Sequence, residues 1–139
     1  MKLLSNITSK LFCKKHKIEI SNSLKKVVDK YPDPAALMTY DSEWNSRVFL
    51  YANKRHQKLT GYSNDEIVGK TPDMFIGKNT LEKTINSAQE GLKNSSFWNG
   101  IITNIRKDGT ETLVDLLIFA ICYEGKNYFV VLKRSIRGT

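Results

Sequence analysis

Residues 48–70 read VFLYANKRHQKLTGYSNDEIVGK, and this stretch decides the fold. The run Arg47–Ala52 is rich in residues that favour strands, so it predicts one. Asn53 is a good N-cap for a short helix, and Gly61 suits the left-handed conformation that ends such a helix. The motif Ser63–Glu66 has the spacing of a capping box and opens a second helix. The stretch therefore predicts one strand followed by two short helices.

The flanking patterns predict four more strands and one longer helix. The helix is expected over about residues 80–92, after a capping signal at Asn79–Glu82. Asp108-Gly109 is typical of a type I′ hairpin turn, and Glu124-Gly125 predicts another two-residue turn. The four strands are expected at Ala35–Tyr40, Phe97–Arg106, Thr110–Tyr123 and Lys126–Arg134. This order predicts an α+β domain: a hairpin, a helical block and an antiparallel meander.

The last two strands are apolar on both faces. Val114, Leu116 and Ile118 alternate with Leu113, Leu117 and Phe119, and Val130 and Leu132 alternate with Phe129 and Val131. An antiparallel sheet with one face in water should instead alternate apolar and polar residues. We therefore expect the second face to be covered by a helix at residues 21–31 or by a second copy of the chain.

Length and charge suggest one globular domain with a basic N-terminal arm. The chain has 139 residues, of which 40% are hydrophobic and 26% charged, and its net charge is +8. Residues 1–30 hold eight lysines and two acidic residues, so most of the positive charge lies in this arm. A basic arm on a nearly neutral domain does not predict nucleic-acid binding.

The expected organisation has four parts. Residues 1–20 form a basic amphipathic segment, with a helix predicted over 3–17; residues 21–33 are a flanking helix and linker; residues 34–135 are the domain; and residues 136–139 are a tail. Five apolar residues make a weak membrane anchor, so we expect the segment to dock or to pair in a homodimer rather than to bind a membrane. Two distant cysteines and no leader pattern favour the cytoplasm.

Four motifs resemble the PAS family (Per-Arnt-Sim sensor and interaction domains). They are Tyr51-Ala52-Asn53, Leu59-Thr60-Gly61-Tyr62-Ser63, Glu66-Ile67-Val68-Gly69 and Trp98-x-Gly100-x-x-x-Asn104-x-Arg106-Lys107-Asp108-Gly109. The resemblance covers about residues 30–135. It implies a PAS fold: a five-stranded antiparallel sheet of order 2-1-5-4-3, short helices that enclose a pocket on one face, and a flanking helix or partner on the other.

The resemblance also bears on cofactors. The light-sensing flavin group of PAS domains (LOV) has a reactive cysteine in the motif G-x-N-C-R-F-L-Q, and Pro72 stands at that position here. Asn104 matches one flavin-contacting asparagine, but Val114 stands at the second and Lys133 at the flavin-contacting glutamine. FMN photochemistry is therefore disfavoured. FAD stays an open alternative, because FAD-binding PAS domains share the motif around Trp98.

Other chemistry finds little support. Haem-binding PAS domains usually place a histidine on the long helix, and residues 80–92 contain none; His56 is expected to be a satisfied core residue. No catalytic triad, phosphate loop or metal-ligand spacing is recognisable. We therefore expect a protein that is not an enzyme.

Two hypotheses follow. The first is a sensory module that binds a small molecule or cofactor inside and regulates contacts with a signalling partner; the second is a ligand-free module that forms a homodimer through its N-terminal helices and outer sheet face. The cofactor-binding candidates are Met74, Asn104, Leu116, Val114, Trp98 and Ile85. Further pocket candidates are Met38, Leu50, Ile67, Val130 and Leu132. For Trp98 the alternative is an ordinary core aromatic, and for Asn104 a strand-end residue bonded to backbone.

Overall fold

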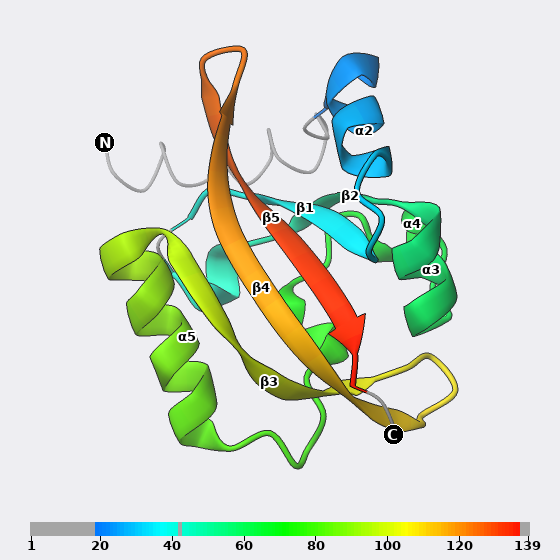
Figure 1. The fold of residues 1–139 in the computed structure, drawn as a ribbon, viewed down its shortest axis with the longest axis vertical. Helices are drawn as coiled ribbons and strands as arrows, with labels where there is room; N and C mark the ends of the chain where they lie inside the picture. Colours follow the sequence, from blue (N-terminus) through cyan, green and yellow to red (C-terminus); the bar gives the residue numbers. More distant parts are fainter. Residues whose placement is uncertain (1–18, 42, 137–139) are drawn as a thin grey trace, which may run out of the picture.

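Five antiparallel strands form one sheet in the order β2-β1-β5-β4-β3, which confirms the expected topology (Figure 1). The computed structural model describes residues 19–41 and 43–136, so the helix predicted over 3–17 lies outside the described residues. The strands are β1 Ala35–Thr39, β2 Phe49–Ala52, β3 Phe97–Ile105, β4 Glu111–Tyr123 and β5 Lys126–Ser135. Long pairings of β4 with both β3 and β5 make this half of the sheet the larger one.

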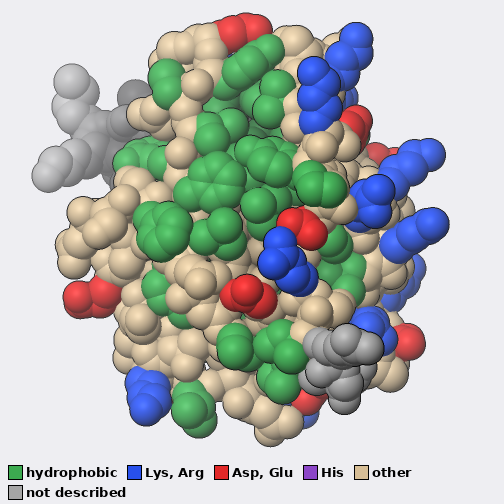
Figure 2. Space-filling view, viewed as in Figure 1, with side chains coloured by type: hydrophobic (Ala, Val, Ile, Leu, Met, Phe, Trp, Pro, Cys, Tyr) green, Lys and Arg blue, Asp and Glu red, His purple; other side chains and the backbone are tan. Residues whose placement is uncertain are grey.

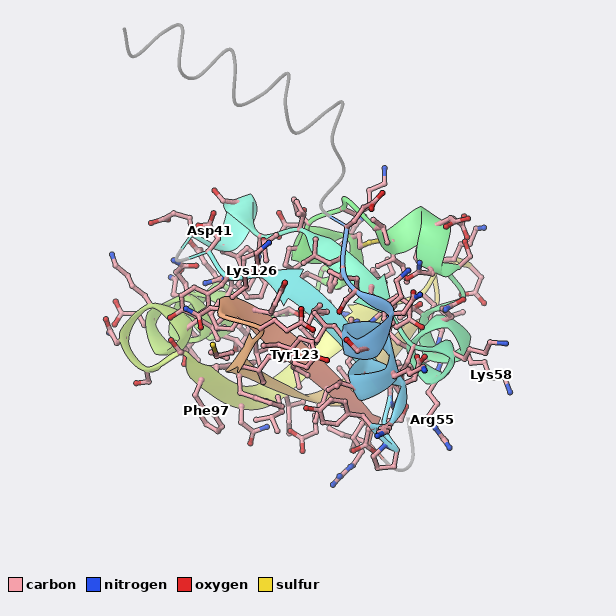
Figure 3. All side chains as sticks on the ribbon, turned by 90° about the horizontal axis from the view of Figure 1, so that it is seen from above. Asp41, Arg55, Lys58, Phe97, Tyr123 and Lys126 are labelled. Carbon is pink, nitrogen blue, oxygen red and sulfur yellow. The ribbon has the colours of Figure 1, made fainter. Side chains whose placement is uncertain are left out.

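Short helices cover the inner face of the sheet, and one helix lies on the outer face. The helices are α2 Asn22–Asp29, η1 Trp44–Ser46, α3 Lys54–Thr60, α4 Asn64–Ile67, η2 Pro72–Phe75 and α5 Glu82–Ser95. Ser63 and Glu66 form the predicted capping box of α4, and Asn53 caps α3. Arg55 and Lys58 project from α3 away from the domain (Figure 3).

Two hydrophobic clusters lie on opposite sides of the sheet. The inner cluster includes Met38, Phe49, Phe75, Leu116 and Phe129, beneath the short helices. The outer cluster joins Leu24 and Val28 of α2 to Ala35, Leu37, Leu50 and Val130. The sheet is therefore apolar on both sides, and α2 supplies part of the expected cover.

The α2 helix covers only part of the outer face. Phe97, Ile101 and Leu113 of β3 and β4 are exposed. Hydrophobic side chains gather in a patch on this face of the molecule (Figure 2), with β4 and β5 in front in the same view (Figure 1). Phe97 projects outward from the start of β3 (Figure 3).

The phase of β5 differs from the prediction in one important respect. Val130 packs in the outer cluster, and Leu132 packs against it, so neither residue lines the interior. Phe129 and Val131 belong to the inner cluster instead. Side chains alternate between faces along a strand, so Lys133 also belongs to the inner face.

Two smaller predictions were wrong. The predicted I′ turn at Asp108-Gly109 needs positive φ at both residues, but only Gly109 has it, at 87°. Instead, the Arg106 N–H donates to Thr110 O at 2.8 Å, and the Gly109 N–H donates to Arg106 O at 2.9 Å. These two bonds close a longer loop. The turn with positive φ at both residues is Glu124-Gly125.

The second error concerns the start of α5. The helix begins at Glu82 and runs to Ser95, and its N-cap Leu81 makes no side-chain capping bond. The Thr80 hydroxyl, expected near a cap, accepts the Thr103 N–H at 3.1 Å instead. This bond ties the approach to α5 to strand β3, and Leu81 is left exposed.

Candidate functional site

Lys133 carries an ammonium group inside an otherwise apolar core. The residue is 2% exposed, and its Nζ lies 3.7 Å from the ring centroid of Phe75. Nζ donates to Asn104 Oδ1 at 3.0 Å. Burial lowers the pKa of Lys133 to about 7, because the charged form loses its water. Perturbed groups of this kind concentrate at functional sites.

Asn104 and His56 extend this polar group. Asn104 Nδ2 is buried and makes no hydrogen bond, and the same holds for both ring nitrogens of His56. The imidazole lies edge-on to Phe75, with 5.2 Å between ring centroids. Its pKa is lowered well below the usual value, first by burial and then by the charge of Lys133. We call Lys133, Asn104 and His56 the inner polar cluster.

A small cavity adjoins Lys133. Its volume is about 20 Å³, close to the space that one water molecule needs. It lies between the inner sheet face and the two 3₁₀ helices, and its lining residues include Met38, Trp44, Phe75, Leu116 and Lys133. The Trp44 indole N–H donates to Asp73 Oδ1 at 2.9 Å, which joins η1 to η2 across the mouth of this region.

The structure brings only some of the predicted site residues together. Asn104 joins the inner polar cluster, Leu116 lines the cavity, and Val114 is buried in the inner cluster beside them. Met74 is half-buried against the same core. Ile85 is half-buried on α5 and does not line the cavity.

Trp98 takes a packing role. Its ring is buried in the inner cluster, and its Nε1–H donates to Ser87 Oγ of α5 at 3.1 Å. Ile67 and Met38 are also buried in the inner cluster, as predicted, whereas Leu50 lies in the outer one. Trp98 therefore holds α5 against the sheet.

Sequence reasoning missed Lys133 and His56 as site residues. The signal for Lys133 was its phase, because it follows Phe129 and Val131 at a period of two on the inner face. His56 was expected to have its hydrogen bonds satisfied, and that expectation was wrong. Burial without a partner is a tertiary property that no local pattern encodes.

The family model for PAS domains matches residues 34–134. The chain belongs to the PAS domain family. It is a sensory and signalling module of the PAS type, and such domains are typically non-enzymatic. No helix in the described part of the chain has the length and apolar character that a membrane crossing requires.

Comparison with known proteins places light-responsive proteins near this PAS domain. The blue-light photoreceptor of Listeria monocytogenes is 25% identical over 97 residues, which are 69% of this chain and 38% of the relative. Phototropin-1A of Oryza sativa subsp. japonica is 31% identical over 70 residues, which are 50% of this chain and 8% of the relative. This PAS domain thus spans well under two thirds of the curated relatives it matches.

The fold is shared with solved structures. The Rhodobacter sphaeroides LOV protein superposes with a TM-score of 0.72 and is 15% identical in sequence. The match covers 84% of this PAS domain and 66% of that chain. At this identity the likeness shows the fold alone.

Proposed function

We propose that this PAS domain senses a small ligand in its inner core and transmits the change through its outer sheet face to a second copy or a signalling partner. The inner polar cluster is the observation that carries the proposal. Burying a charge costs several kcal/mol per ion, so a core ammonium with no carboxylate partner among the described residues calls for a function. The role is binding rather than catalysis, and the setting we propose is the cytoplasm.

A flavin fits these residues poorly. The buried Pro72 opens η2 where a LOV domain would need its cysteine, so no flavin–thiol bond can form there. Lys133 and Val114 replace two polar flavin contacts, and the space beside Lys133 is about 20 Å³. Ligand pockets for drug-sized molecules are typically ~300 Å³ or larger. We therefore propose that the ligand is smaller than FMN, FAD or haem.

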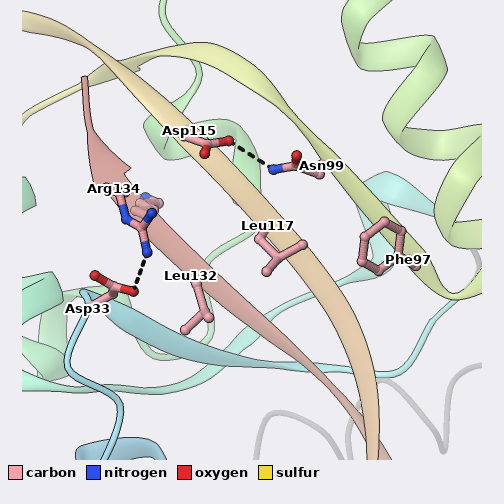
Figure 4. Close-up of a pocket in the computed structure, with 8 residues that line it drawn as sticks. Asp33, Phe97, Asn99, Asp115, Leu117, Leu132 and Arg134 are labelled. Atoms are coloured by element: carbon pink, nitrogen blue, oxygen red, sulfur yellow. Dashed lines mark hydrogen bonds and ion pairs between the residues drawn. The ribbon is translucent and has the colours of Figure 1, made fainter. Parts of the chain in front are cut away.

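The outer face supplies a route for output. A groove of about 290 Å³ runs over β3, β4 and β5 (Figure 4). Leu117 and Leu132 lie on its floor, between the Asn99–Asp115 hydrogen bond of 2.8 Å and the Arg134–Asp33 ion pair of 3.3 Å. We propose that this groove and the exposed residues beside it form a homodimer contact, with the N-terminal segment 1–20 contributing.

The spectrum and native mass of the purified 139-residue protein test the proposal. We expect no flavin or haem absorption, and a complex heavier than the 15.9 kDa chain by a small ligand. A stoichiometric flavin spectrum would overturn the choice of ligand. If the mass is that of the bare chain, NMR of methyl groups in the inner cluster during titration with metabolite extracts decides whether any ligand enters the core.

The small cavity also favours a second candidate function, a ligand-free dimerisation module. A core with about 20 Å³ of free space is nearly fully packed. Under this alternative, inner methyl resonances would not respond to any extract, while the oligomeric state would still depend on the outer face. The same experiments therefore separate the two functions.

A further inference from the structure

The inner polar cluster has hydrogen-bond donors without matching acceptors. Asn104 Oδ1 is already occupied by Lys133 Nζ, which has two more hydrogens to donate. Asn104 Nδ2 and the His56 ring nitrogens make no hydrogen bond. Leaving a buried donor unpaired costs roughly 1–3 kcal/mol, and native proteins contain few such groups. Asn104 and His56 are in this state beside a lysine with hydrogens to spare, which indicates a missing acceptor.

The charges around the cluster are also one-sided. No carboxylate of the described residues lies within ion-pair distance of Lys133. The charge of Lys133 acts on His56 of α3, and Arg47, which is also buried, stacks its guanidinium on Phe129 of the inner cluster at 5.2 Å. Asp41 and Glu43 act on Arg47 rather than on Lys133. The interior therefore has positive or neutral donors and no counter-charge beside the ammonium.

We infer that Lys133, Asn104 and His56 form a binding site for a small carboxylate, with Lys133 as its ionic anchor. This inference deepens the proposed function and rests on it. A carboxylate offers two oxygens with about four acceptor positions, which match the unused hydrogens of the ammonium and of the Asn104 amide. Lys133 and Asn104 lie on strands β5 and β3, and His56 lies on α3. Lys133 lines the cavity, whose opposite wall is built from η1 and η2, each a single turn.

Size narrows the ligand further. The cavity of about 20 Å³ holds roughly one water molecule, so even formate must displace a lining side chain. A longer carboxylate must displace Phe75 or Trp44, which are the η2 and η1 residues at the cavity. The apolar neighbours Met38 and Leu116 suit a short alkyl end rather than a second charge. Formate and acetate are therefore the probes we choose.

Binding should be linked to proton uptake. A carboxylate pairs with the protonated form of Lys133, so a solution above the pH where this amine titrates must supply one proton per ligand bound. Affinity then falls about tenfold for each pH unit above 7. His56 is neutral in this range because its pKa is lowered, so it contributes an N–H and no charge.

Calorimetric titration of the full chain with sodium formate and sodium acetate tests the site. Measurements at pH 7, 8 and 9, in buffers of different ionisation enthalpy, give both affinity and proton uptake; sodium chloride serves as the control for ionic strength. We expect saturable binding of at least one carboxylate, close to one proton taken up at pH 8, and a tenfold loss of affinity per pH unit.

Three variants assign the effect to the cluster. Lys133→Met removes the anchor, and Asn104→Asp places an internal carboxylate beside it; each is expected to weaken binding at least tenfold. Lys126→Met removes the same charge from an exposed position of the same strand and should bind as the wild type does. If Lys133→Met fails to fold, Asn104→Asp carries the test, because it alters one atom of a side chain.

Several results would overturn the inference. They are an absence of saturable binding by either carboxylate, an equal response to chloride, an affinity independent of pH, or unchanged affinity in Asn104→Asp. If native mass spectrometry then finds a different ligand, the sensory function survives and only the carboxylate site is lost. If native mass spectrometry finds no ligand and the inner methyl resonances respond to no extract, both the sensory function and the carboxylate site are overturned.

Discussion

The indole of Trp98 lies directly against the backbone of Gly100, two residues further along β3. A Cβ at position 100 would lie 2.3 Å from the Trp98 ring, far inside contact distance. The same indole donates to Ser87 of α5. Gly100 therefore leaves the space that lets Trp98 hold α5 on the sheet.

We predict that Gly100→Ala lowers the free energy of unfolding by about 1–3 kcal/mol, because the rigid ring must leave its position. In a Trp98→Leu background the same substitution should cost much less, since the nearest atoms around Gly100 are those of the indole. Urea denaturation of the wild type, the two single variants and the double variant gives the coupling free energy between positions 98 and 100. Equal costs in both backgrounds would show that the indole is not the obstacle.

The buried Lys133 should make stability rise with pH. Between pH 7 and about 9.5 the unfolded lysine keeps its proton while folded Lys133, with a pKa of about 7, loses it. The free energy of unfolding of the wild type should therefore rise, relative to Lys133→Met, by up to about 1.4 kcal/mol per pH unit. The window closes at about pH 10, where the unfolded lysine also begins to lose its proton.

His56 should act at the acid end. Its folded pKa lies well below 6.5, so below pH 6.5 the unfolded state binds a proton that the folded state does not. Stability should fall on acidification by up to about 1.4 kcal/mol per pH unit. In His56→Phe, where the new ring would lie among Phe49 and Phe75, this part of the acid loss should vanish. If the urea midpoints of the wild type and His56→Phe fall by the same amount between pH 7 and 5, the prediction is contradicted.

The outer sheet face should control association. Ile101→Lys places a charge at a 58% exposed position on this face, and Leu81→Lys does the same at a 60% exposed position at the start of α5. We expect light scattering to show a smaller mass for Ile101→Lys at concentrations where the wild type and Leu81→Lys associate. A shared mass for all three proteins would count against a dimer on this face.

The α2 helix should behave as part of the core. Leu24→Ala removes a fully buried side chain and should cost about 2–5 kcal/mol. Lys26→Ala, two residues later at an exposed position of the helix, should change stability by less than about 0.5 kcal/mol. Thermal and urea unfolding measure both. Trimming the chain for association experiments should therefore stop before α2, because removal of residues 1–30 would delete Leu24 and Val28 and expose the outer cluster beneath them.

The topology could be predicted from the sequence because short local patterns mark where its strands and helices begin and end. The caps at Asn53 and Ser63 and the turn glycines Gly61, Gly69, Gly109 and Gly125 fix short elements whose order allows few sheets. The inner face of β4 was also predictable from its alternation. In β5 the unbroken run of apolar residues hid the phase, so Val130 and Leu132 were placed on the wrong face.

The polar part of the site was predicted only through Asn104. Its contact with Lys133 crosses from β3 to β5 over the intervening β4, and no sequence spacing encodes such a meeting. In the sequence, Lys133 stands out only as the residue at the position of the flavin-contacting glutamine. Only its register opposite Leu116 and its burial on the inner face distinguish it.

Lys133 and Arg134 are adjacent in β5, and their side chains lie on opposite faces of the sheet. The Lys133 side chain reaches Asn104 inside, while its own backbone N–H donates to Pro34 O at 2.9 Å and the next side chain, Arg134, reaches Asp33. Asp33 and Pro34 belong to the segment that connects α2 to β1. The residue that reaches the inner polar cluster through its side chain is thus bonded through its backbone to the segment that leads from α2 into β1.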